Sequence, residues 1–119
     1  MFKRGVEIIV SVKAKVMKTL SSLDVEVCYL EREDDGTFPF VVFNVAETPL
    51  SFSDDEEDMT LFLITINIFS KPDYNFESLK NEIVKLMKEA GFRKTRIPNA
   101  EFLESENVYN QPMGFAYCE

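Results

Sequence analysis

Residues 59–69 read MTLFLITINIF, and this stretch decides the fold. One side of the segment is apolar at every second position, as in a buried β-strand. Its members are Phe62, Ile64, Ile66 and Ile68. The opposite side is also apolar at Leu61 and Leu63 and becomes polar after them. A strand with two apolar faces belongs at the centre of a sheet, where a helix is the expected cover for the second face and a subunit contact is the alternative.

Two strands and a loop are predicted before this segment. Apolar and polar residues alternate over residues 25–29, which is typical of a half-buried strand. Residues 38–46 are apolar on both faces, and Pro39 near their start suits the beginning of a strand or a sheet edge. Residues 48–58 break the pattern with a proline and a run of carboxylates, so we expect a long acidic loop there.

Two amphipathic helices flank these strands. Apolar residues recur at helical spacing over residues 4–21 and again over residues 76–90. Asn75 is a favourable N-cap for the second helix, because its side chain can accept a hydrogen bond from a free N–H of the first turn. Gly91 is the expected left-handed residue that ends the same helix.

The last third of the chain predicts two further strands, at residues 92–97 and 108–118. Pro112 and Gly114 indicate a bulge or an edge in the second of them. The predicted order is therefore α-β-β-β-α-β-β. We expect an α+β fold in which two helices pack on one mixed or antiparallel sheet, and a single domain that spans residues 1–119.

The formal net charge of −8 is unevenly distributed. Residues 1–21 carry +4, residues 22–58 carry −11 and residues 59–119 carry −1. This balance argues against specific nucleic-acid binding, which needs a basic face. No apolar run approaches the ~20 residues of a membrane span, so no membrane association is predicted.

The residue types that most enzymes need are missing. The chain has no histidine, which removes the commonest general base and the usual partner of a nucleophilic serine or cysteine. Cys28 and Cys118 are too far apart in sequence for a metal clip, form no disulfide framework, and are expected to be buried thiols. Four scattered glycines build no phosphate loop. We therefore expect no catalytic site, no cofactor and no metal.

Two charged clusters have more than one interpretation. The run of five carboxylates at residues 54–58 consists of hard oxygen ligands for a divalent cation, but it lacks the alternation and glycine of a calcium loop. A solvated loop is the favoured interpretation. Arg93, Lys94 and Arg96 form the only compact basic cluster. An ordinary strand with one solvated face is favoured there, over a weak nucleic-acid contact or a contact with the acidic loop of a neighbouring copy.

Taken together, these segments resemble the tail-completion (tail-terminator) proteins of long-tailed bacteriophages and prophages. An N-terminal helix leads into a short strand, and FPFVVF at residues 38–43 is followed by AETP at residues 46–49. A polar loop then leads into a long strand that ends with INIFS at residues 66–70. A helix ending at residues 91–92 precedes two final strands, with MGF at residues 113–115. The resemblance covers nearly the whole chain.

The resemblance implies a structural role without a reaction. Such proteins form a homo-oligomeric ring, usually of six subunits, which completes the tail tube and joins it to the head-side connector. The implied partners are further copies of the chain, the tail tube protein and the connector. The implied locations are the host cytoplasm during assembly and the tail or neck of the virion. The acidic loop would face the lumen or a neighbouring ring, and its charge would keep passing DNA from adhering.

The candidate contacts with other subunits or with the lumen combine the acidic loop, the second face of the long strand and the basic cluster. They are Phe52, Asp54, Asp55, Glu56, Glu57, Asp58, Leu61, Leu63, Arg93, Lys94 and Arg96. The acidic stretch leaves one alternative from another class, an inhibitor that mimics DNA. Such a mimic should hold carboxylates on a rigid surface, whereas much of this charge falls in a predicted loop.

Overall fold

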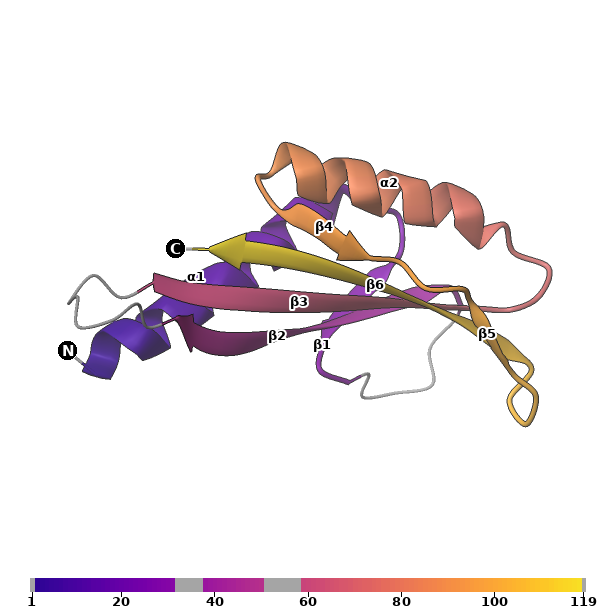
Figure 1. The fold of residues 1–119 in the computed structure, drawn as a ribbon. Coiled ribbons are helices and arrows are strands. Elements are labelled where there is room, and N and C mark those ends of the chain that lie inside the picture. The colour runs from indigo at the N-terminus through magenta and orange to yellow at the C-terminus, as the bar shows by residue number, and fades with distance from the viewer. Residues whose placement is uncertain (1, 32–37, 51–58, 119) are drawn as a thin grey trace.

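The computed structural model describes residues 2–31, 38–50 and 59–118, which form two α-helices and one six-stranded sheet (Figure 1). The elements in chain order are α1 (Phe2–Thr19), the 3-10 turn η1 (Leu20–Ser22), β1 (Glu26–Tyr29), β2 (Phe40–Leu50), β3 (Met59–Ser70), α2 (Phe76–Glu89), β4 (Arg93–Arg96), β5 (Glu101–Leu103) and β6 (Val108–Cys118). The predicted α+β class is confirmed, and the two predicted helices and five predicted strands are all present.

The strands lie in the order β1-β2-β3-β6-β4, with β5 following β4 along the outer edge of β6. β1 runs parallel to β2, and every other pair is antiparallel, so the sheet is mixed. The long alternating strand β3 lies at the centre, between β2 and β6, as its two apolar faces predict.

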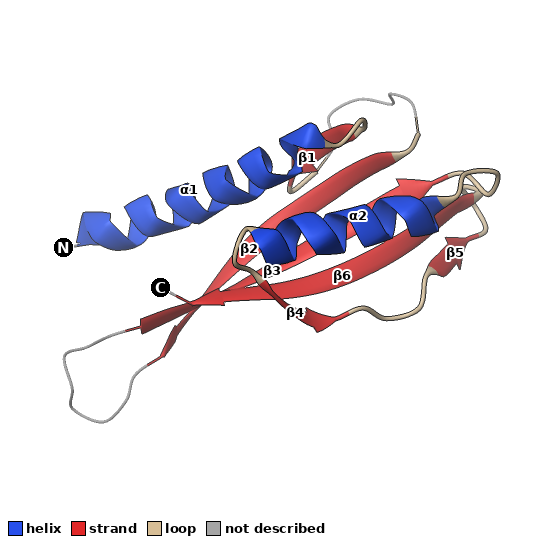
Figure 2. Cartoon of the chain, turned by 90° about the horizontal axis from the view of Figure 1, so that it is seen from above, coloured by secondary structure: helices blue, strands red, loops and turns tan. Residues whose placement is uncertain are grey.

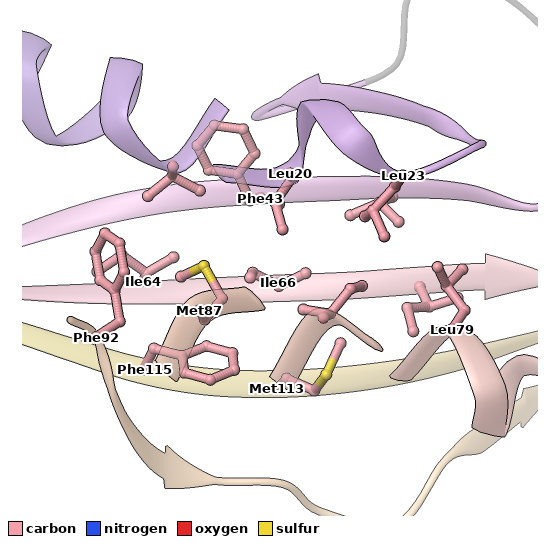
Figure 3. Close-up of a cluster of buried hydrophobic side chains, with 14 of the residues drawn as sticks. Leu20, Leu23, Phe43, Ile64, Ile66, Leu79, Met87, Phe92, Met113 and Phe115 are labelled. Atoms are coloured by element: carbon pink, nitrogen blue, oxygen red, sulfur yellow. The ribbon is translucent and has the colours of Figure 1, made fainter. Parts of the chain in front are cut away.

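Both helices pack on one face of the sheet (Figure 2). The buried cluster takes alternate residues from the three long strands, which all point to the same side, and closes them with the apolar stripes of both helices (Figure 3). Its helical members are Val12, Val16, Leu20, Leu79, Ile83 and Met87, and its strand members include Val41, Phe43, Phe62, Ile64, Ile66, Ile68, Met113 and Phe115. We call this side of the sheet the covered face.

The ends of α2 follow from single residues, as predicted. The side chain of Asn75 accepts a hydrogen bond from the N–H of Glu77 at 3.2 Å. Gly91 has a φ of 100°, a left-handed backbone conformation that residues with a Cβ rarely adopt. The N–H of Phe92 then donates to the carbonyl of Met87 at 2.9 Å, which closes the helix and aims the chain into β4.

Three predictions about the strands need correction. β2 continues to Leu50, so residues 48–50, which were predicted as the start of the loop, belong to the strand. The strand tolerates Pro49 because, among the described strands, this part of β2 pairs only with β3, so its other edge has no partner that needs an N–H. β5 was not predicted at all. The bulge interpretation of β6 is wrong, because the register shift lies in β4 opposite Gly114. The edge interpretation fits Pro112, which among the described strands pairs only with β3.

Candidate subunit interface

The second face of the sheet, which we call the open face, carries no helix in the described part of the chain. Leu63 on this face is 39% exposed, whereas its neighbour Ile64 on the covered face is 1% exposed. The expectation that a helix covers the second face of β3 is therefore wrong. The reason is that the apolar stripes of both helices are already used on the covered face.

Strand pairing brings part of the predicted contact set together. Leu63 lies opposite Ala116 of β6, and Ala116 lies opposite Arg93 of β4, so the three form one row across the open face. Leu61 and Arg93 also line one shallow depression of about 280 Å³. Lys94 differs, because it pairs with Phe115, whose side chain belongs to the covered face. The open face therefore holds Leu61, Leu63, Arg93 and Arg96. Lys94 is not part of this surface.

The remaining predicted contacts cannot be placed on this surface. Phe52 and residues 54–58 lie outside the described residues, so their facing the lumen or a neighbouring ring stays a prediction.

The two cysteines lie on the open face, at Cys28 opposite Val42 and at Cys118 opposite Leu61. Cys118 is exposed and Cys28 is half-buried, so the prediction of buried thiols is wrong for Cys118 and is not confirmed for Cys28. The sheet is not covered by a helix on this face, which explains their access to solvent.

A larger depression of about 320 Å³ lies next to this row, and we call it the Gly114 depression. Its lining includes Leu63, Thr65, Thr95, Arg96, Pro98, Pro112 and Gly114. A Cβ at position 114 would lie 2.7 Å from Oγ1 of Thr95, so the glycine leaves room for that side chain. The register shift in β4 places Thr95 over this glycine. A glycine that lets another segment approach closely thus creates the floor of the depression.

One wall of the Gly114 depression is held by a buried amide. Nε2 of Gln111, which is 2% exposed, donates to the carbonyl oxygen of Pro98 at 2.8 Å and to that of Pro112 at 2.8 Å. These bonds tie the segment between β4 and β5 to β6. Sequence reasoning missed this contact, because a single glutamine in a strand gives no signal of its partner.

The end of the sheet where β3 finishes and β6 begins is rich in aromatic rings. Phe40 and Phe69 stack at 5.0 Å between ring centroids on the open face. On the other side, Tyr109 contacts Phe76 of α2 at 5.8 Å and Phe102 of β5 at 4.8 Å. Phe102 remains 40% exposed. Sequence reasoning missed this group, because β5 has only three residues and its pairing with β6 depends on the turn after it.

The described residues hold no candidate metal cluster and carry no net charge. Within residues 2–31, 38–50 and 59–118, no three His, Cys, Asp or Glu side chains gather closely enough to hold a metal ion. No helix in the same part of the chain is both long and apolar enough to cross a membrane. The same residues include twelve acidic and twelve basic side chains, so they are formally neutral. The net charge of −8 is carried by residues 32–37 (−2), residues 51–58 (−5) and Glu119 (−1).

Comparison with solved structures shows where this fold recurs. A chain of the virion of a native gene transfer agent particle superposes with a TM-score of 0.62, although the two sequences are only 14% identical. The match covers 87% of this chain and 90% of the other. At this level of identity the likeness establishes a shared fold. No protein-family model and no curated protein sequence matches the chain.

Proposed function

We propose that this chain is a virion structural protein, a subunit of a ring that completes a bacteriophage tail tube and joins it to the head-side connector. The observation that carries the proposal is the fold shared with a chain of a virion particle over nearly the full length of both chains. The resemblance of the sequence to tail-completion proteins supports the more specific role at the tail.

The open face and the neighbouring strand β4 have the features of a surface through which subunits assemble. An uncovered sheet face with exposed leucine, a basic edge strand and a mainly apolar depression is the kind of surface that marks a protein interface. The edge strand β4 is only four residues long and all four are exposed, which limits uncontrolled strand pairing while leaving charge available for a partner. We expect the ring contacts to use this side of the molecule.

The alternative of a DNA mimic has less support. A mimic needs a fixed array of carboxylates, but the described residues hold as many bases as acids. Three of those bases, Arg93, Lys94 and Arg96, lie exposed on one strand. A binding assay against a duplex-binding nuclease would support the mimic only if the chain inhibited the enzyme at stoichiometric concentration.

Native mass spectrometry across a range of protein concentration, with and without Mg²⁺, tests the ring. The expected result is a closed oligomer, above all one with about six times the 13.7 kDa subunit mass. Negative-stain images of the same sample should show rings with a central channel. A strict monomer at every concentration would contradict the proposal.

A further inference from the structure

The Gly114 depression has a basic rim with no acidic neighbour in its lining. Arg96 lines the depression and Arg93 lies in the adjacent row, and both are exposed on β4. The residues that line it within the described chain include no carboxylate. A surface of this kind, apolar in the middle and positive at the edge, is complementary to an apolar side chain flanked by acids.

The same chain presents such a group at the turn between β5 and β6. Residues 101–107, which we call the hairpin tip, contain three exposed carboxylates and no base. They are Glu101, Glu104 and Glu106. Phe102 stands among them with 40% of its surface exposed. Aromatic residues that are held in place at a surface are common anchors of protein interfaces.

The hairpin tip is a fixed structure and needs little ordering to bind. The N–H of Glu106 donates to the carbonyl of Leu103 at 3.1 Å, and the N–H of Asn107 donates to that of Glu104 at 3.3 Å. Asn107 takes the left-handed conformation, with a φ of 56°, that closes the turn. Nζ of Lys71 further donates to the carbonyl oxygen of Glu106 at 3.4 Å. A preformed element loses less conformational entropy when it docks.

The tip and the depression cannot meet within one molecule. Phe102 lies opposite Tyr109, which is five residue steps from Gly114 along the extended strand β6, or roughly 17 Å at the usual rise of a strand. The chain thus carries two different surfaces that are complementary in charge and that lie at separate places along β6. Contacts between unlike surfaces of identical subunits repeat head to tail, and they close into a ring where the rotation allows.

We propose that the hairpin tip of one copy docks into the Gly114 depression of the next. Phe102 enters the depression, and the glutamates of the tip face Arg93 and Arg96 of the receiving copy. The volume of about 320 Å³ leaves room for a single aromatic side chain. This inference rests on the proposed function, because it describes the contact that builds the ring.

Charge reversal in two separate chains tests the contact. One variant carries Arg93→Glu and Arg96→Glu, and the other carries Glu104→Lys and Glu106→Lys. Each variant alone should assemble at least about tenfold more weakly than the wild type in sedimentation velocity, because like charges face each other across the contact. An equimolar mixture should recover the oligomer, since every tip then meets a depression of opposite charge. Reversal of Lys85 and Lys88, which are exposed on α2, is the charge-matched control and should leave assembly unchanged.

Alanine substitution of two exposed aromatic residues, Phe102 as the test and Tyr74 as the control, provides a second and independent measurement. Phe102→Ala should weaken assembly by about tenfold through loss of the buried ring. Tyr74→Ala should not, although Tyr74 is exposed to a similar degree, at 37%. Equal effects of the two substitutions would overturn the inference.

The outcomes separate this inference from the ring itself. A wild type that forms a ring while both charge-reversed variants assemble normally overturns the docking contact and leaves the proposed function standing. Loss of assembly in both variants without recovery in the mixture also overturns it, because the two surfaces then do not face each other. A wild type that stays monomeric throughout overturns both proposals together.

Discussion

The two faces of this sheet differ far more in their surroundings than in their sequence. Leu63 and Ile64 are adjacent aliphatic residues on the same strand, yet the first is 39% exposed and the second is buried. Their residue types do not distinguish them, and the alternation of β3 separates the two faces only after Leu63, where the open face becomes polar. The difference comes from the helices, since both apolar stripes close over the face of Ile64 and none remains for the face of Leu63. An apolar residue on an uncovered face is then available for a contact between molecules.

Replacing each of these two residues with alanine should reveal the largest difference between the faces, measured as the loss in the free energy of unfolding. Ile64→Ala removes fully buried atoms and should lower the free energy of unfolding by about 2–4 kcal/mol. Leu63→Ala should lower it by less than about 1 kcal/mol, because its side chain is already partly in water. Urea denaturation followed by circular dichroism, at a concentration where the chain is monomeric, measures both values. Similar losses at the two positions would mean that the open face is covered in solution.

A smaller loss in the free energy of unfolding is expected at Gly114, where the open face is tightly packed. Gly114→Ala would place a Cβ 2.7 Å from Oγ1 of Thr95, and the stiff χ1 of threonine limits the escape of that oxygen. We expect a loss of about 1–2 kcal/mol in the free energy of unfolding. Removing the obstructing atom in the Thr95→Ala, Gly114→Ala double variant should recover most of it. A double variant that is no more stable than Gly114→Ala would assign the loss to the backbone of Arg96, the next nearest group at 3.4 Å.

Much of the covered face could be predicted from the sequence, because its signals are local. Strict alternation identifies β3, helical spacing identifies both helices, and Asn75 and Gly91 mark the ends of α2. These patterns depend on residues that are neighbours along the chain. The same holds for the order of elements, apart from β5, whose three residues are too few to show a period.

The open face could be predicted only in fragments, because its surface depends on strand pairing. Leu63 and Arg93 were each candidates from sequence, but only the β3–β6–β4 register shows that they share a row. The Gly114 depression depends on a register shift in a neighbouring strand, which no local pattern reports. Phe102 was missed for the same reason. The part of the predicted site at residues 54–58 stays a prediction from composition alone.

The substitution Leu63→Asp should have the smallest effect on the free energy of unfolding and yet a clear effect on assembly. The introduced carboxylate would lie on the exposed face, in the row of Ala116 and Arg93, where water and a nearby cation both stabilise its charge. We therefore expect the free energy of unfolding to change by no more than about 1 kcal/mol. Assembly should weaken strongly in sedimentation velocity, because the new charge would be desolvated at the edge of the Gly114 depression and would repel the glutamates of an incoming hairpin tip.

Ala46→Asp is the matched control for this substitution. Ala46 lies opposite Leu63 in the same row and is also exposed, but it is on β2, away from β4 and the depression. Its substitution should leave both folding and assembly nearly unchanged if the contact uses the β4 side of the open face. If Ala46→Asp disrupts assembly as much as Leu63→Asp does, the contact covers the whole open face and the docking of a single hairpin tip is too small to account for it. If only Leu63→Asp disrupts assembly, the difference between two residues of one row locates the contact at the basic edge of the sheet.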